Sequence, residues 1–172
     1  MDFLLLCAKA LMLAIPLYIT NGCALIFRGK TPVDFNVKFL DNKPLLGKGK
    51  TINGTLRGIA CGFLASAAIF FAFPEVSAAF GTSYLLLGAL LSIGAIAGDM
   101  AASFLKRRFG IEQGKSAFLL DQLDFIAGGL ILASIIYVPS LVEIILLVVL
   151  TPAFHLIGNF IAFKAKRKKV PW

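Results

Sequence analysis

The chain has 172 residues, of which 59% are apolar and 15% are charged. In a soluble domain about a quarter of all residues are usually charged. This composition therefore argues against an ordinary water-soluble domain and favours lipid as the solvent. The formal net charge of +8 would suit nucleic acid. Basic residues beside membrane spans more often contact anionic headgroups, however, so we expect membrane lipids and no nucleic acid as partners.

Five stretches lack Asp, Glu, Lys and Arg, and each is close to the ~20 residues that a helix needs to cross a bilayer core. These stretches are residues 10–27, 58–74, 76–98, 125–142 and 144–163. The sequence therefore predicts an all-α integral membrane protein with five transmembrane helices and one membrane-embedded domain over residues 1–172. Lys9, just before the first span, is expected to reach the outer interface.

The distribution of basic residues predicts the orientation. The segments rich in Lys and Arg are residues 28–50, 106–115 and 164–169. The connections at 74–83 and 139–140 contain neither residue type. Positive loops remain in the cytoplasm, so we expect a multi-pass protein of the cell membrane with its N-terminus outside and its C-terminus in the cytoplasm. The polar segments 28–54 and 106–124 then both face the cytoplasm.

Two glycine patterns predict close helix packing. Gly54, Gly58 and Gly62 recur at every fourth residue, and Gly94 and Gly98 repeat this spacing. Small residues at this spacing form one face of a helix, and in lipid such a face allows two backbones to approach closely. We therefore expect a packed bundle.

Three carboxylates are candidates for chemistry. Asp121 and Asp124 share one helix face, and Asp99 lies seven residues before Lys106, roughly 10 Å deeper in the membrane. An ionisable group at that depth indicates function. The alternatives are a charge pair at a helix N-terminus for Asp121 and Asp124, and a salt bridge from Asp99 to Lys106 or Arg107. With the neighbouring bases and Ser103, the carboxylates resemble a divalent-metal phosphate site.

A glycine-rich segment precedes the second predicted span. Gly49-Lys50-Thr51 imitates the end of a P-loop, but Pro44 replaces the leading glycine and no βαβ unit surrounds it, so a Walker A site is rejected. Backbone N–H groups of such a turn at a helix start can still bind phosphate. The alternative is a flexible basic loop on lipid headgroups. His155 and Asn159 either line an aqueous cleft or form hydrogen bonds between two helices.

These motifs, taken together, resemble a known family. Ser103-x-x-Lys106-Arg107, followed by Asp121-Gln122-Leu123-Asp124 with Gly98-Asp99 upstream, resembles the signature of the phosphatidate cytidylyltransferase (CDP-diglyceride synthetase) family. Gln122 replaces the usual Arg, and the H-G-G element of bacterial members is absent. With five expected spans and G-K-T-x-x-G at Gly49 to Gly54, the chain is most similar to the archaeal branch, the CDP-archaeol synthases. Pro32-Val33-Asp34 resembles a further segment of that loop.

The resemblance implies a CTP-dependent cytidylyltransferase whose active site faces the cytoplasm. The phosphate of digeranylgeranylglyceryl phosphate, an isoprenoid lipid phosphate also called unsaturated archaetidic acid, would attack the α-phosphorus of CTP and yield CDP-archaeol and pyrophosphate. It implies Mg²⁺ on the catalytic residues Asp99, Asp121 and Asp124. The residues implied to contact substrate are Lys50, Thr51, Gly54, Ser103, Lys106, Arg107 and Gln122.

Two other activities stay open at the level of sequence. A CTP-dependent polyprenol kinase would transfer the γ-phosphate of CTP to an alcohol, and a small transporter would relay protons through Asp99 and His155. A CDP-alcohol phosphotransferase is disfavoured because its D-G-x-x-A-R array is absent. The oligomeric state is open as well, with a homodimer among the arrangements that the sequence allows.

Overall fold

The structure is a computed structural model that describes residues 3–113, 115 and 117–164. Across these residues it contains helices, turns and two isolated bridges, and no β-strand. The helices are α1 (Phe3–Ile26), α2 (Ile52–Ala72), α3 (Pro74–Ala78), α4 (Tyr84–Arg108), α5 (Phe118–Ala133) and α6 (Leu141–Lys164). The all-α class is confirmed for the described part of the chain.

Three helices are long and apolar enough to cross a membrane, namely α1, α2 and α4. A shorter apolar helical segment covers residues 141–152 of α6. The 16 residues of α5 extend about 24 Å at 1.5 Å per residue, which is less than the ~30 Å of a hydrocarbon core. The structure therefore supports a membrane protein, with three helices in its described part that are both long and apolar enough to span.

Two boundaries differ from the apolar stretches. The third stretch begins at Val76, but the chain forms the short α3 there and turns at Gly81, whose φ is +66°, before Ser83 caps α4. The fourth stretch continues to Val142, but α5 ends at Ala133. Apolar composition alone does not separate a helix from the connection that follows it. Pro139, which cannot donate a backbone hydrogen bond, lies in that connection.

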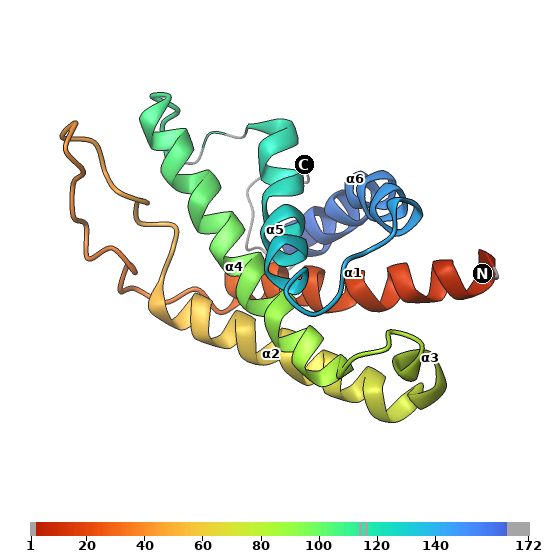
Figure 1. The fold of residues 1–172 in the computed structure, drawn as a ribbon. Coiled ribbons are helices and arrows are strands. Elements are labelled where there is room, and N and C mark those ends of the chain that lie inside the picture. Colours follow the sequence, from red (N-terminus) through yellow and green to blue (C-terminus); the bar gives the residue numbers. More distant parts are fainter. Residues whose placement is uncertain (1–2, 114, 116, 165–172) are drawn as a thin grey trace.

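The glycine faces bring the helices together as expected. In Figure 1, α1 and α2 run side by side and α4 crosses the bundle. A methyl group added at Gly58 would lie 2.8 Å from the backbone oxygen of Thr20 in α1, and one at Gly94 would lie 2.5 Å from that of Gly128 in α5. Backbones therefore touch at both interfaces. The core lies where α1, α4, α5 and α6 meet and includes Leu13, Leu17, Leu87, Leu91, Phe125 and Leu147.

The prediction for Lys9 is wrong, because its side chain is buried inside the protein. Its ammonium lies 3.6 Å from the carboxylate of Glu143 in α6 and stands over the rings of Phe80 and Tyr137, 5.0 and 4.8 Å from their centroids. Tyr137 donates a hydrogen bond of 2.7 Å to the same carboxylate, as does the backbone N–H of Ser140. The carboxylate that stabilises Lys9 inside the protein belongs to Glu143, 134 positions further along the chain. The hydrophobic periodicity of the sequence could not predict this pairing.

Candidate active site

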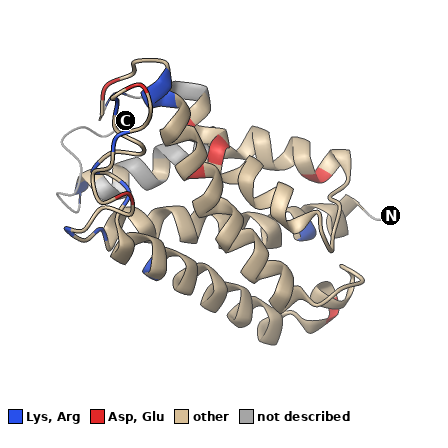
Figure 2. Ribbon diagram, turned by 60° about the vertical axis from the view of Figure 1, so that its left-hand side comes forward, with Lys and Arg blue, Asp and Glu red and all other residues tan. Residues whose placement is uncertain are grey.

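The loop between α1 and α2 carries the glycine-rich segment and projects from one end of the bundle, beside the C-terminal end of α4 (Figure 1). Lys and Arg gather at this end, as Figure 2 shows. We call it the basic end, defined by residues 28–50 and by Lys106 to Arg108. The loop therefore meets the last turn of α4 at a strongly basic part of the described molecule.

Asp34 fixes the shape of this loop. Its buried carboxylate accepts hydrogen bonds from the backbone N–H groups of Asn36 (3.0 Å), Leu46 (2.8 Å) and Gly47 (2.9 Å). Burial alone would raise the pKa of Asp34, but these donors outweigh it and hold the pKa below its ordinary value. One side chain thus ties together the two halves of the loop. The sequence offered Asp34 only as part of a motif, and this role was missed.

Arg108 attaches the outer part of the loop to α4. Its guanidinium pairs with Asp41 at 3.0 Å, donates to the backbone oxygen of Pro44 at 2.6 Å and lies 4.9 Å from the ring centroid of Phe39. Lys43 donates in return to the backbone oxygen of Arg108 at 3.0 Å. The loop is therefore held at its base by Asp34 and further out by Arg108.

The glycine turn opens α2, as the sequence predicts. The buried hydroxyl of Thr51 accepts from the N–H groups of Gly54 (3.3 Å) and Gly29 (3.1 Å) and so caps the helix. With its amide oriented to satisfy both donors, Gln113 accepts from Gly49 at 3.0 Å and from Lys48 at 3.1 Å. These N–H groups are therefore engaged within the protein. Contact of Thr51 and Gly54 with substrate stays a prediction.

Close contact of α4 with α5 brings two carboxylates together. A methyl group added at Gly98 would collide with the backbone oxygen of Asp124 and lie 2.9 Å from the Cα of Gly128. Asp99 follows Gly98 directly. The charge of Asp124 is close enough to those of Asp99, Asp121 and Lys50 for all three to act on it. Asp99 and Asp121 therefore both lie within electrostatic range of Asp124, near the contact between α4 and α5.

Two lysines neutralise this carboxylate cluster. The ammonium of Lys50 contacts both carboxylate oxygens of Asp99 at 2.5 Å, and Lys106 pairs with Asp121. Asp121 also accepts from the backbone N–H of Ala117 at 3.0 Å. Asp99 therefore takes its partner from the loop just before α2, and not from its own helix as the salt-bridge alternative supposed. Lys50 and Lys106, which were expected to contact substrate phosphates, are paired with carboxylates in this structure.

The donor set suits a hard cation, although the described residues contain no preformed metal cage. No group of three His, Cys, Asp or Glu side chains in the described residues could hold an ion, and two of the three aspartates are engaged by lysine. Mg²⁺ needs only one or two carboxylates when phosphates and waters supply its other ligands. One or two of Asp99, Asp121 and Asp124 would meet that requirement if the lysines turned away.

The remaining predicted residues have different surroundings. Ser103, Arg107 and Gln122 are buried, and Arg107 Nε makes no hydrogen bond to any described residue. A buried donor without an acceptor is costly, and contact of Arg107 with substrate stays a prediction. The side chains of His155 and Asn159 lie outside the described residues.

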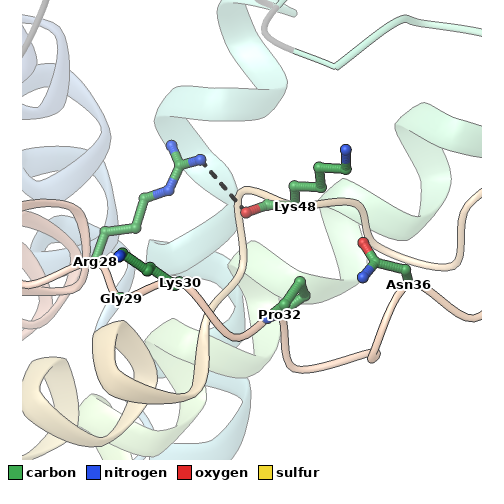
Figure 3. Close-up of a pocket in the computed structure, with 6 residues that line it drawn as sticks. All are labelled: Arg28, Gly29, Lys30, Pro32, Asn36 and Lys48. Carbon is green, nitrogen blue, oxygen red and sulfur yellow. Dashed lines mark hydrogen bonds between the residues drawn. The ribbon is translucent and has the colours of Figure 1, made fainter.

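A basic cavity lies beside the glycine turn and was not foreseen from the sequence. It measures about 420 Å³ and is lined by Arg28, Gly29, Lys30, Pro32, Asn36 and Lys48. Figure 3 shows Arg28 reaching towards the backbone oxygen of Lys48, to which it donates a hydrogen bond of 3.4 Å. Three cations and no acid line this cavity, so it suits a phosphate anion. The signal in the sequence was the density of Arg28, Lys30 and Lys48 around one turn.

Comparison with known proteins gives one consistent family. The family model described as CarS-like CDP-archaeol synthase matches residues 3–172. A CDP-archaeol synthase of Methanococcus maripaludis strain C5 is 42% identical over all of both chains. One of Methanocaldococcus jannaschii is 42% identical over 92% of this chain and 93% of that protein, and one of Sulfolobus acidocaldarius is 37% identical over the same shares.

A solved structure has the same fold. It is described as an intramembrane enzyme for archaeal membrane lipids biosynthesis, and it is 36% identical to this chain with a TM-score of 0.80. The match covers 88% of this chain and 93% of that structure. Similarity therefore extends over nearly the whole membrane-embedded domain, and is not confined to the motif residues.

Proposed function

This chain belongs to the CarS-like CDP-archaeol synthase family, and we propose that the ion-paired site between α2, α4 and α5 performs its reaction. The chain is a membrane-embedded transferase that uses CTP to make CDP-archaeol in archaeal lipid biosynthesis. The observation that carries the site is the pairing of Lys50 with Asp99 and of Lys106 with Asp121, beside Asp124. The kinase and transporter alternatives lose their support, because the relatives are synthases.

The reaction is a transfer of a cytidylyl group between two phosphates. An oxygen of the lipid phosphate bonds to the α-phosphorus of CTP while the bond from that phosphorus to the β-phosphate oxygen breaks. Pyrophosphate leaves with the electron pair. Because the lipid phosphate is already an anion near neutral pH, the protein needs no general base, and its task is alignment and neutralisation of charge.

Lys50 and Lys106 supply this neutralisation by exchanging partners. Without substrate they neutralise Asp99 and Asp121 in a partly buried place, where unpaired carboxylates would be destabilising. When phosphates enter, the two ammonium groups turn to the phosphate oxygens. The buried guanidinium of Arg107 offers a third positive group.

The two aspartates that the lysines release, together with Asp124, would hold Mg²⁺. Asp99, Asp121 and Asp124 are the ligands we assign, with substrate phosphates completing the set. When bound, the ion supplies charge neutralisation on the triphosphate. The basic cavity at Arg28 and Lys30 lies beside the turn that carries Lys50 and would admit CTP from the aqueous side.

We further propose five spans with the N-terminus outside and the site open to the cytoplasm. The basic end and the neutral connections at 79–83 and 134–140 support this orientation. In a cysteine-free background, Glu112→Cys, in the exposed loop between α4 and α5, should react with an impermeant thiol reagent only from the cytoplasm, and Val138→Cys only from outside. Labelling of both from one side would contradict five spans. Light scattering of the purified protein would test a homodimer.

The function is tested with CTP labelled at its α-phosphate, Mg²⁺ and digeranylgeranylglyceryl phosphate, followed by extraction into organic solvent. The label should enter the lipid, whereas a γ-phosphate label should not. Asp124→Asn should abolish transfer, since it keeps the shape but removes a charged ligand. Glu112→Gln, in an exposed loop, is the matched control and should keep full activity. Cytidylyl transfer at a near-normal rate by Asp124→Asn would show that the active site lies elsewhere.

A further inference from the structure

The outer part of the loop at the basic end exposes large apolar side chains. Residues 33–45, which we call the loop hairpin, reverse direction at Asn42, with a hydrogen bond of 3.0 Å from the N–H of Leu45 to the backbone oxygen of Val37. Leu40 is 93% exposed, Phe35 69% and Val37 55%. Scattered apolar residues on a surface are ordinary, but these three lie on one short hairpin outside the membrane-length helices, where exposure to water is unfavourable.

The backbone at Phe35 is held in a conformation that turns its ring outward. Phe35 and Asn36 have φ angles of 46° and 61°, which are rare for residues other than glycine and rarer for a bulky aromatic residue. The buried carboxylate of Asp34 accepts a hydrogen bond of 3.0 Å from the Asn36 N–H. The backbone oxygen of Asp34 accepts one of 2.8 Å from the Val37 N–H. A strained residue that its surroundings hold in place indicates a function. Phe35 is both strained and exposed, so its ring is held towards the outside of the protein.

The hairpin begins close to the end of a membrane-length helix. The N–H of Val33 donates to the backbone oxygen of Lys50 at 2.8 Å, and Pro32 bridges to Thr51, the residue that caps α2. Phe35 lies only two residues beyond Val33, which limits its distance from this point to about 7 Å. The headgroup layer on each side of a bilayer is about 5–8 Å thick. Phe35 is therefore within reach of that layer.

The charges of the hairpin complement an anionic surface. Lys38 and Lys43 are exposed on it, and Lys30 and Lys48 lie at its base. Of its two acidic residues, Asp34 is buried, and Asp41, which is exposed, is paired with Arg108. Apolar tips among lysines are the signature of a segment that lies in the boundary between headgroups and acyl chains of an anionic membrane.

We infer that the loop hairpin docks on the bilayer surface at the basic end, with Phe35, Val37 and Leu40 inserted between the headgroups of anionic lipids. Both ends of the loop join membrane-length helices, so lipid is already adjacent to this surface, whereas a second copy would have to be recruited. Docking would hold the Gly47-to-Lys50 turn at the level of the membrane, since Asp34 joins that turn to the hairpin. The inference goes beyond the proposed chemistry and does not depend on it.

A fluorescence experiment tests docking without any need for catalysis. Trp172→Phe removes the chain's single tryptophan, and Leu40→Trp then reports on the hairpin in nanodiscs that contain one copy and anionic lipid. We expect blue-shifted emission and quenching by a spin label near the lipid headgroups. Glu112→Trp, in the exposed loop between α4 and α5, is the control and should emit as in water.

A second variant tests the role of Phe35. Phe35→Asn tolerates the positive φ but removes the ring, so in the Leu40→Trp background it should reduce lipid quenching at least twofold while the loop keeps its shape. Water-like emission from Leu40→Trp would overturn the inference. A blue shift that appears only with two copies per disc, without lipid quenching, would also overturn it and assign the patch to a second chain. Transfer to a short-chain, water-soluble lipid phosphate should stay normal in Phe35→Asn, which separates this test from that of the active site.

Discussion

A single methyl group at Gly98 should separate the two halves of the active site. Its Cβ would collide with the backbone oxygen of Asp124 and lie 2.9 Å from the Cα of Gly128, both in α5. Because these atoms are backbone, α4 and α5 must move apart by about 1 Å, and Asp99 moves with α4. Overpacking of this kind costs about 1–3 kcal/mol. A displacement near 1 Å at reacting groups lowers rates by about a hundredfold.

The assay for Gly98→Ala combines thermal unfolding in detergent with transfer of α-labelled cytidylyl groups to lipid. Gly22→Ala in α1 is the matched control, because nothing lies within 4 Å of its added Cβ. The control should keep full activity and gain up to about 1 kcal/mol from the better helix propensity of alanine. Equal activity and equal stability of the two variants would refute the claim that backbone contact between α4 and α5 positions Asp99.

Three further perturbations test the site and its loop. Lys50→Ala should lower kcat/KM for CTP at least tenfold, about 1.4 kcal/mol, while Lys115→Ala should not; equal kinetics would exclude phosphate contact. Mg²⁺ should raise the Tm of the unmodified protein but not that of an Asp121→Asn, Asp124→Asn double variant, and an equal shift would place the metal elsewhere. The pKa of Asp34 is lowered on folding, so its stabilisation is present above the unfolded value of about 3.9 and is lost as pH falls through the lower folded value. Acid unfolding of Asp34→Asn should therefore depend less on pH in that range, and curves that run parallel would contradict this role.

The sequence predicts those features that a single helix determines by itself. Charge-free stretches indicate the long helices because backbone groups in lipid must be satisfied within the segment. Glycines at every fourth residue mark the faces that touch, and the Gly98 face does contact α5. Asp121 and Asp124 share a helix, so their proximity could be predicted from spacing. The motif resemblance then identified the family correctly.

Features that depend on contacts between distant segments could not be predicted in the same way. Lys50 was assigned to phosphate, but its pairing with Asp99 requires the loop just before α2 to meet the middle of α4. Asp34 looked like a motif residue, and only the folded loop shows that it accepts three backbone N–H groups. The alternative of a flexible loop did not anticipate this network. A partner that is remote in the chain leaves no local pattern.

The buried pair of Lys9 and Glu143 has a consequence for biogenesis. Lys9 enters the membrane with the first helix to be synthesised, whereas its counter-charge arrives with α6, the last. A lysine costs about 2.5–3.5 kcal/mol at the centre of a membrane helix and less towards the ends, and Lys9 is the seventh residue of α1, so a nascent chain without α6 holds an uncompensated charge at somewhat lower cost. Chains truncated before Leu141 should therefore be degraded faster in pulse-labelled cells, and Lys9→Met should slow that degradation. Stable insertion of α1 therefore depends on α6, which supplies the carboxylate that pairs with Lys9.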